Sequence, residues 1–503
     1  MTGDLLFVGG DLSGIQKFIY NISSKKAMVS LKGRSAYLKR FTDEVCKRIL
    51  DIPEIQKSPQ DKDEMKIYCS GGKFYLQVPD TPTIRKSIDA IKRDVEAQLW
   101  EEHRGQLAIN IAYLPFQYDG DNVVVDGETD NIGILWKKMT EKFTILKNQK
   151  FKDELLDSYG EFFEVQKVGG DIKVCQVTGI EGDVVPVKMY DDEEDMMVSP
   201  SVKAQIDLGK KLRDEQHFKM LEEYAGETYL GILRMDIDNL GAKFIRSDFK
   251  SMKKYKQFSL ALDWFFDAEH GRLHDLQTQD EYREFLNIVY AGGDDIFVVG
   301  RWDKVIDFAA RIKEEFKSYC HDKLEEETLS ISGGVAIVNA KFPIAKAAEM
   351  AGEAEDAAKK YNNKQKNAFN MFGESISWEN EFDYVKSYKE QFVTLINKAN
   401  LSRGILHKIM TYEAIVKENQ VIAAQNEKGD QKRKPDLSYL WHTTYYLTRF
   451  MGKEKDNKAV YLFCKDLRDK QLLSAEKFRL MALAARWAEL ELRMNNSTNN
   501  KNE

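Results

Sequence analysis

The 503-residue sequence has few of the features that mark secreted, zinc-binding or membrane proteins. Its five cysteines are odd in number and none is spaced as a CxxC pair. This usage is typical of reduced thiols in a cytosol and leaves no zinc framework. The sequence begins without a cationic leader, and nowhere do about 18 uncharged apolar residues run together, as a membrane-spanning helix needs. We therefore expect a cytoplasmic protein that does not associate with membranes.

An excess of positive charge is also missing. The formal net charge is -7, which argues against a freestanding protein that binds nucleic acid irrespective of sequence. Hydrophobic residues make up 43% of the chain, which is enough to build buried cores. At roughly 150 residues per domain, the length indicates about three domains. The composition thus predicts a globular, multidomain protein.

Two clusters of aspartates are the most informative feature that is present. Asp236 and Asp238 end the apolar run that starts at Leu230, and Asp294 and Asp295 follow a second apolar run. Because both runs are β-prone, both clusters are expected at strand ends or turns, where carboxylates can converge on a divalent cation. A Gly-Gly-Asp-Asp sequence alone is a common surface turn, so its coupling to the upstream cluster carries the hypothesis.

The chain contains an internal repeat. Residues 10–19 share with residues 235–245 the order Asp, aliphatic, polar, small and Lys-Phe-Ile, with a slip of one residue, and residues 67–76 mirror residues 289–298. A helical pattern follows each of these hairpins, over residues 84–103 and 305–319, and each pattern leads to another apolar strand. Each copy therefore has the order strand, helix, hairpin, helix, strand, which is the ferredoxin-like βαββαβ unit.

The two copies differ where the acidic residues lie. The first copy offers Lys73 and Phe74 in place of the paired aspartates of the turn, and Ser13 in place of Asp238. Only the second copy is therefore expected to hold metals. The pair is similar to a homodimeric nucleotidyl cyclase whose partner has been fused and simplified, so we expect the active site between the two copies.

These patterns predict an α+β fold with two ferredoxin-like palm domains of the nucleotidyl cyclase type that face each other. A small intervening domain and a C-terminal helical domain complete the fold. The expected bounds are 1–130 for the degenerate first palm, 131–225 for the linking helical and irregular domain, 226–386 for the second palm, 387–494 for the helical domain and 495–503 for a disordered tail.

The acidic copy suggests nucleotidyl transfer. Two divalent ions about 3.5 to 4 Å apart can assist deprotonation of a 3′ hydroxyl and neutralise the charge on the α-phosphate and the departing pyrophosphate. Mg²⁺ takes hard oxygen ligands and keeps waters, so Asp236 and Asp294 with the phosphates are sufficient. Asp295 or Asp238 is expected to complete or orient the shell.

Glycines and lysines extend the candidate site. Gly292 and Gly293 can adopt positive φ and leave no side chain between the backbone and an incoming phosphate. Lys366, with Lys364 second, follows a predicted helix, and a point cation suits mobile phosphate oxygens. The alternative for these lysines is a solvated helix end.

Residues Gly10–Tyr20 and Leu31–Leu38 together closely resemble the first palm signature of the large subunit of type III CRISPR effector complexes, the Cas10 family of the Csm type. The second palm of that family is similar to Leu230–Phe244 and to Ala291–Asp295. The C-terminal helices also resemble its last domain, less specifically. The likeness covers nearly the whole chain.

This resemblance implies two facing palms that convert ATP to cyclic oligoadenylate when the complex senses target RNA. It implies two Mg²⁺ or Mn²⁺ ions and a second ATP at the first palm. The catalytic residues would be Asp236, Asp294 and Asp295, and the metal ligands Asp236, Ile237, Asp294 and Asp295. The candidate nucleotide contacts are Ser13, Gly14, Ser70, Gly71, Gly72, Asn239, Gly292, Gly293, Lys364 and Lys366.

The implied partners are a guide RNA, the target RNA and the other protein subunits of the complex, and the product would act on a separate effector protein. Two departures from the family pattern matter. An HD-type nuclease domain often comes first, but here the first palm starts close to Met1, so no HD nuclease activity is expected. Between the palms, Cys175 is kept and Thr178 stands where a second cysteine is expected, so the zinc module is degenerate and zinc is not expected.

Alternative functions stay open at this point. A non-catalytic scaffold would use the palms as a nucleotide sensor and the helical domain to dock guide RNA and subunits, although clustered aspartates without a cation oppose it. Adenylate could also be joined to another acceptor held by the first palm. A freestanding cyclase would not explain the long helical C-terminus.

Overall fold

The computed structural model describes residues 4–22, 27–58, 61–157, 159, 173–179, 182–188, 195–226, 228–245, 249, 251–324, 328–427 and 433–499. The chain separates into two compact units, Met1–Glu353 and Ala354–Glu503, and each has its own arrangement. In these described ranges, no helix is both long and apolar enough to cross a membrane.

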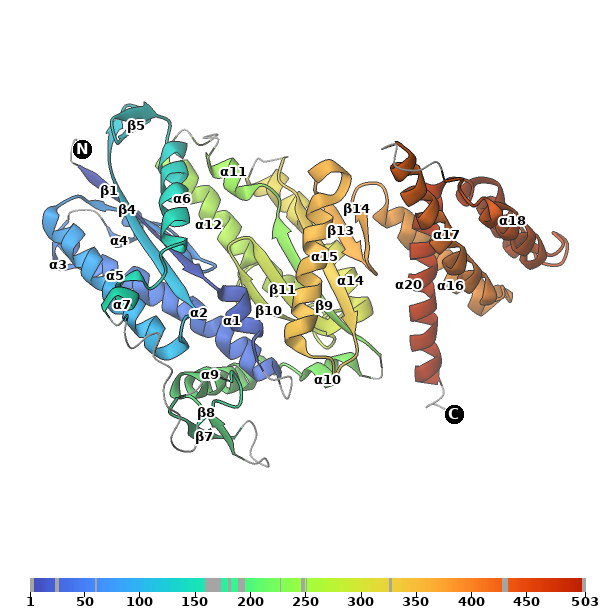
Figure 1. The fold of residues 1–503 in the computed structure, drawn as a ribbon, viewed down its shortest axis with the longest axis horizontal. Coiled ribbons are helices and arrows are strands. Elements are labelled where there is room, and N and C mark those ends of the chain that lie inside the picture. The colour runs from blue at the N-terminus through green and yellow to red at the C-terminus, as the bar shows by residue number, and fades with distance from the viewer. Residues whose placement is uncertain are drawn as a thin grey trace. The chain divides into compact units, whose positions relative to one another are not determined.

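The first unit contains two sheets (Figure 1). The first sheet has the strand order β2-β3-β1-β4-β5-β6, and β1 pairs antiparallel with both β3 and β4. Its strands are β1 (Leu5–Ser13), β2 (Lys66–Ser70), β3 (Lys73–Pro79), β4 (Ala108–Asp119), β5 (Asn122–Val125) and β6 (Glu128–Asp130). The helices of this part of the chain are α1 (Ile15–Tyr20), α2 (Ala27–Leu50), α3 (Pro53–Gln56), α4 (Lys62–Met65), α5 (Pro82–His103), α6 (Gly133–Lys147) and α7 (Lys152–Asp157).

Alternation along β1 gives the first sheet two buried faces, because successive strand residues point to opposite sides. Leu6 and Val8 join a large apolar core that includes residues of α2 and α5. Phe7 packs on Trp136 of α6 with ring centroids 4.9 Å apart. Helices therefore cover both faces of the sheet.

The second sheet, within the first unit, has the order β10-β11-β9-β12, with β9 paired antiparallel to β11 and β12. Its strands are β9 (Leu230–Ile237), β10 (Leu286–Gly292), β11 (Asp295–Arg301) and β12 (Ile331–Val338). The helices that accompany it are α10 (Leu221–Ala225), α11 (Leu240–Ile245), α12 (Met252–Phe266), α13 (Arg272–Gln277), α14 (Trp302–Tyr319), the π-helix η1 (Cys320–Leu324) and α15 (Ile344–Lys364).

Both sheets repeat one arrangement. In each, a strand, a helical segment, a hairpin, a helix and a strand follow in order, and the first strand lies between the second hairpin strand and the last strand. Both hairpins shift register at the same point, just before Tyr68 in β2 and just before Tyr290 in β10. Because bulges of this kind are specific features of a strand pair, the shared irregularity confirms the predicted duplication.

The two copies pack on each other reciprocally. Helix α12 of the second copy packs on β2 of the first, and α2 of the first copy packs on β10 of the second. The rings of Tyr20 and Phe297 have centroids 4.5 Å apart, and the Lys32 ammonium donates a hydrogen bond to the carbonyl of Ile288 at 3.1 Å. One apolar core contains residues of both copies, so they form a joined pair.

A smaller region links the two copies and contains β7 (Val185–Val187), β8 (Met196–Val198) and α9 (Pro200–Gln216). Cys175 of this region is buried. Burial would raise the pKa of its thiol, but hydrogen bonds from the Thr178 side chain and from neighbouring backbone groups lower it. Thr178, which stands where the family pattern has a second cysteine, therefore forms a hydrogen bond with Cys175.

The second unit consists of a hairpin and helices. Its elements are β13 (Ala368–Met371), β14 (Glu374–Ser377), α16 (Phe382–Ala399), α17 (Gly404–Glu427), α18 (Ser438–Met451), α19 (Lys458–Asp466), the π-helix η2 (Leu467–Gln471) and α20 (Ala475–Asn499). Arg403 Nε lies 2.8 Å from Glu489 Oε2 and ties the start of α17 to α20. Helix α20 extends into the segment 495–503 that was expected to be disordered, and 500–503 fall outside the described residues.

Candidate functional site

Strand pairing brings together aspartates that are far apart in the sequence. Asp236, at the end of β9, is the register partner of Asp295, at the start of β11. The backbone N–H of Ile237 donates to the carbonyl of Asp294 at 3.3 Å. Residues directly opposite in an antiparallel pair have Cβ atoms roughly 4.5 to 5.5 Å apart. The three half-buried carboxylates therefore share one edge of the second sheet.

This edge suits hard divalent cations. All its side-chain donors are carboxylate oxygens, which Mg²⁺ and Mn²⁺ prefer. Within the described residues, the oxygens of Asp236, Asp294 and Asp295 do not all lie within 4.8 Å of one another. Such an open set fits ions that keep waters and take further oxygens from phosphates. The roles of these residues, and of the Ile237 carbonyl, stay predictions.

Asp238, considered as a further member of the metal shell, has another environment. Its carboxylate is buried and accepts hydrogen bonds from the hydroxyls of Ser330 at 2.7 Å and Ser332 at 2.9 Å. The equivalent residue of the first copy, Ser13, accepts a hydrogen bond from the Asn110 amide at 3.0 Å. The side chain at this position therefore hydrogen-bonds to the last strand of the sheet in both copies, as Asp238 in the second and as Ser13 in the first.

Register corrects the alignment of the two turns by one residue. Ser70 pairs with Lys73 across the first hairpin, and Gly292 pairs with Asp295 across the second. Gly72 and Lys73 therefore take the places of Asp294 and Asp295, so the expectation of Lys73 and Phe74 was wrong. Phe74 is fully buried in the apolar core instead. The error arose because the order of residues alone leaves the alignment of the two turns uncertain by one residue. The pairing across each hairpin fixes that alignment.

The turn glycines are needed for contact between the copies. Gly293 has φ 69° and the equivalent Gly71 has φ 59°, whereas Gly292 is not in the left-handed region, contrary to expectation. A Cβ atom on Gly292 would lie 2.9 Å from the Cα of Gly71, and one on Gly71 would lie 2.7 Å from the Gly292 backbone. The two hairpin tips therefore touch, and any larger residue would push them apart.

Two further candidate nucleotide contacts occupy equivalent places. Gly14 precedes α1 with φ 94° and Asn239 precedes α11 with φ 61°. Glycine and asparagine are the residues that enter the left-handed region most readily. Both positions therefore turn the chain from the first strand into the following helix, beside the edge that carries the aspartates.

The first copy neutralises its remaining aspartate with lysine. Asp11, the equivalent of Asp236, is buried, and its carboxylate lies 2.6 Å from the ammonium of Lys147 at the end of α6. Lys73 is its register partner on β3. Desolvation would lower the pKa of Lys73, but the negative charges of Asp294, Asp11 and Asp295 raise it above the ordinary value. Lys73 thus faces carboxylates of both copies.

A hollow of about 110 Å³ lies where the first turn meets the helices of both copies. Ser70, Gly71 and Gly72 line it together with residues of α2, α12 and β10. Burial raises the pKa of Asp263 on α12, although a hydrogen bond from Ser70 opposes that rise. The Ser70 turn therefore borders a hollow that residues of both copies line.

Lys364 and Lys366 belong to the second unit. Tyr361, Asn362 and Asn363 have non-helical backbone angles, so both lysines follow a break in α15 and do not continue its regular helix. Lys366 is half-buried with φ 61°, and the side chain of Lys364 lies outside the described residues. Their contact with a nucleotide stays a prediction.

Two family profiles match this chain. The profile for the second palm domain of Cas10/Cmr2 matches residues 229–370. The profile for domain B of the Csm1 subunit matches residues 4–166. The chain belongs to the Cas10/Csm1 family.

Relatives in this family are similar over most of the chain. The CRISPR system single-strand-specific deoxyribonuclease Cas10/Csm1 (subtype III-A) of Enterococcus italicus is 24% identical over 84% of this chain and 61% of its own length. The protein of the same description from Mycobacterium tuberculosis is 23% identical over 91% of this chain and 63% of its own length. The chain thus spans about three fifths of the length of these Cas10/Csm1 relatives.

Solved structures share the fold. An apo Csm1-Csm4 cassette has a TM-score of 0.64 at 19% identity, covering 97% of this chain and 70% of that chain. A Csm1-Csm4 cassette in complex with one ATP has a TM-score of 0.63, and one in complex with cA4 has a TM-score of 0.60, both at 19% identity, 96% of this chain and 70% of that chain. The Csm1-like fold is therefore shared by nearly the whole chain.

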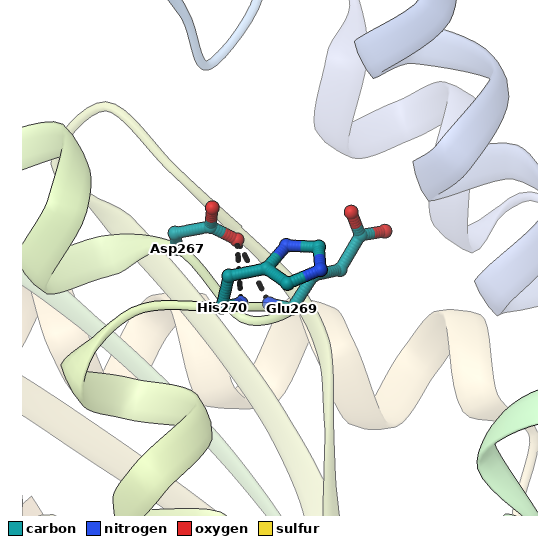
Figure 2. Close-up of side chains that lie close together, drawn as sticks. All are labelled: Asp267, Glu269 and His270. Atoms are coloured by element: carbon teal, nitrogen blue, oxygen red, sulfur yellow. Dashed lines mark hydrogen bonds between the residues drawn. The ribbon is translucent and has the colours of Figure 1, made fainter.

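An acidic cluster that the sequence did not single out lies at the end of α12. Figure 2 shows the Asp267 carboxylate turned toward the backbone N–H groups of Glu269 and His270, which donate to it at 2.8 Å and 3.4 Å. The Lys39 ammonium lies 3.0 Å from Glu269 and 3.9 Å from Asp267. A lysine and two backbone donors thus hold one oxygen of each carboxylate, so the cluster is a capped turn tied to α2.

Sequence reasoning also missed contacts that cross between the copies. The amide of Gln16, on α1 of the first copy, donates to the Asp295 carboxylate at 3.4 Å. Lys73 was noted only as a replaced residue, and Asp263 was not noted at all. The duplication could have indicated Gln16, Lys73 and Asp263, because it predicts that the turn and the helices of one copy face those of the other.

Proposed function

We propose that this chain is the nucleotidyltransferase subunit of a type III CRISPR effector complex and converts ATP to cyclic oligoadenylate when target RNA binds. The observation that carries the proposal is the meeting of Asp236, Asp294 and Asp295 at one sheet edge, opposite a copy in which lysines accompany the remaining aspartate. One lobe with three carboxylates and one lobe with lysines beside its aspartate would suit two nucleotides held for reaction with each other.

In the proposed reaction the chain binds and orients two nucleotides. Asp236, Asp294 and Asp295 would hold two divalent cations, which when bound assist deprotonation of the 3′ hydroxyl and neutralise the leaving pyrophosphate. The Ser70 turn and the hollow beside it would position the acceptor nucleotide. Lys364 and Lys366 would contact the triphosphate as point cations.

The solved relatives support the choice of ligand. A Csm1-Csm4 cassette is described in complex with one ATP and another with cA4. We extend to this chain an adenine nucleotide substrate, a cyclic adenylate product and a Csm4-type partner subunit. Guide RNA, target RNA and the remaining subunits complete the proposed assembly, and the product would act on a separate effector protein. If the first palm holds a molecule other than ATP, the same site would transfer AMP to that acceptor instead.

The decisive experiment compares product formation by the purified assembly and by its variant with Asp294→Ala plus Asp295→Ala. Labelled ATP, Mg²⁺ or Mn²⁺ and target RNA are supplied, and products are resolved by mass. We expect the double variant to lose at least about 100-fold in rate, because even the residues that orient metal ligands are worth about 10- to 100-fold. Asp275→Ala, an exposed aspartate of α13, is the matched control.

Equal yields of the same product from wild type and double variant would exclude the catalytic assignment. Binding of ATP by the wild type with no product under any metal or RNA condition would instead support the scaffold function. Adenylate joined to a molecule other than ATP would identify another acceptor and leave the metal site in place.

A further inference from the structure

The first copy carries a lysine at the position where the second copy has a candidate metal ligand. Across β1 and β3, Asp11 is paired with Lys73, and across β9 and β11 the equivalent pair is Asp236 and Asp295. The first strand therefore ends in aspartate in both copies, and only the opposite residue changes, from carboxylate to ammonium.

Lys147 already provides Asp11 with a partner. Its ammonium lies 2.6 Å from the Asp11 carboxylate, and the backbone carbonyl of Asp11 accepts from the Asn110 amide at 3.0 Å. Neutralising Asp11 therefore does not require Lys73. Lys73 is thus a second lysine beside an aspartate that already has a partner. The negative charge that Lys73 compensates must therefore have another source.

That source lies on the other copy. The tips of the two hairpins touch at Gly71 and Gly292, so the first residues of β3 and β11 start from the same point of contact. Gln16 of the first copy reaches Asp295 at 3.4 Å. Among the charges that raise the pKa of Lys73, that of Asp294 is the largest. Lys73 thus belongs electrostatically to the acidic edge of the second palm.

We propose that Lys73 is a phosphate-binding residue for the nucleoside triphosphate held at the second palm, contributed by the palm that lacks metal ligands. Without cations, the charge of Lys73 offsets part of the negative charge of Asp294 and Asp295. Two divalent ions carry more positive charge than three carboxylates carry negative charge, so once they are bound the ammonium is no longer attracted there. It is then attracted to the triphosphate, and the flexible stem of lysine permits that change of partner.

The inference rests on the proposed function for the identity of the ligand, and it predicts two opposite effects of one substitution. Lys73→Met removes a cation that competes with metal, so Mn²⁺ should bind more tightly in the absence of nucleotide, by about threefold or more, as expected for loss of one nearby like charge. The same variant should bind AMPPNP about tenfold more weakly in the presence of Mn²⁺, because a charge-assisted hydrogen bond is lost.

The experiment measures both quantities on the purified full chain without turnover. Mn²⁺ binding is titrated by electron paramagnetic resonance, and AMPPNP binding by calorimetry at saturating Mn²⁺. Lys73→Arg keeps the charge and should stay near wild type in both. Lys86→Met removes the same charge from an exposed position on α5 and is the matched control.

Tighter Mn²⁺ together with weaker AMPPNP in Lys73→Met, with neither change in Lys86→Met, supports the inference. Unchanged binding of both ligands overturns it, and so does weakening of both, which would indicate a structural role. Absence of AMPPNP binding by the wild type also overturns it. If the wild type binds both ligands but forms no product, the proposed function fails while the role of Lys73 as a phosphate ligand stands.

Discussion

His103 sits in a buried polar group between α5 and α2. Its Nε2 atom is 2.9 Å from the Tyr37 hydroxyl, which donates to the Glu102 carboxylate at 2.9 Å. Burial, and then the positive charge of Arg34, lower the pKa of His103 to about 4. The imidazole is therefore neutral in the folded protein at pH 7, and protonation would place a second cation beside a buried guanidinium.

This neutral histidine makes stability depend on pH. The unfolded chain binds the proton near pH 6.5 and the folded chain only near pH 4, so the unfolded state gains protons first as pH falls. The contribution of His103 is complete above about pH 6.5 and is lost toward pH 4. Between pH 7 and pH 5 we expect a loss of about 2 kcal/mol in the free energy of unfolding.

Urea unfolding of His103→Gln at pH 7 and pH 5 tests this expectation. The pH-dependent difference should shrink by about 2 kcal/mol relative to wild type. His270→Gln, an exposed histidine, should leave it unchanged. An identical pH dependence in wild type and His103→Gln would mean that His103 does not titrate abnormally.

At the scale of residues, the sequence predicted which aspartates gather but not how each is used. Asp236 and Asp294 end β-prone runs, and strand pairing alone brings such ends together. The environment of Asp238 depends on hydroxyls of Ser330 and Ser332, which are distant in sequence and have no periodic signal. The role of Lys73 depended on hairpin register, which order in the sequence left uncertain by one residue.

Among the elements, the crossing of α2 and α9 is closer than ordinary side chains allow. A Cβ atom on Gly209 would lie 2.1 Å from the carbonyl oxygen of Val29, and one on Gly33 would lie 1.9 Å from that of Gln205. Glycines on both helices therefore permit backbone contact. This contact holds the linking region against the first palm.

Gly209→Ala should destabilise the protein by about 1 to 3 kcal/mol, because the added methyl group overpacks a contact with rigid backbone. The opposite sign is expected for Gly241→Ala on α11, where a Cβ atom meets nothing within 4 Å and helix propensity favours alanine by about 1 kcal/mol. Thermal unfolding of both variants measures the difference. Equal stability of Gly209→Ala and wild type would show that the helices can separate without cost.

The helices of the repeat were predicted well because each carries its own signals. The pattern over residues 84–103 corresponds to α5, Pro82–His103, whose start is capped by Thr81 accepting from the Ile84 N–H at 3.2 Å. The pattern over 305–319 corresponds to α14, Trp302–Tyr319. The crossing of α2 and α9 could not be predicted in this way, because a single glycine in a helix does not indicate which other helix packs against it.

At the scale of the molecule, the paired palms depend on contact between their hairpin tips. The hollow beside Ser70 is formed by elements of both copies, so its shape exists only while the tips touch. The duplication predicted that the copies would face each other. It could not predict the hollow, since that arises where the middle of α2 comes close to the end of α12, and this closeness is a product of packing.

Gly71→Val should separate the tips and reduce product formation at least about tenfold, because misplacing reacting groups by about 1 Å costs up to about 100-fold. Gly120→Val is the matched control, since Gly120 has a similar φ of 61° but no atom within 4 Å of an added Cβ. Both variants carry the same backbone strain. Equal activity in the two variants would contradict a role for tip contact.

Reciprocal packing of α12 on β2 and of α2 on β10 resembles the interface of a symmetric dimer, yet both halves lie on one polypeptide. Tethering fixes their effective concentration at a value that no dilution of the protein can change. Whatever binds between the lobes therefore meets a pair already assembled, however low the concentration of the protein.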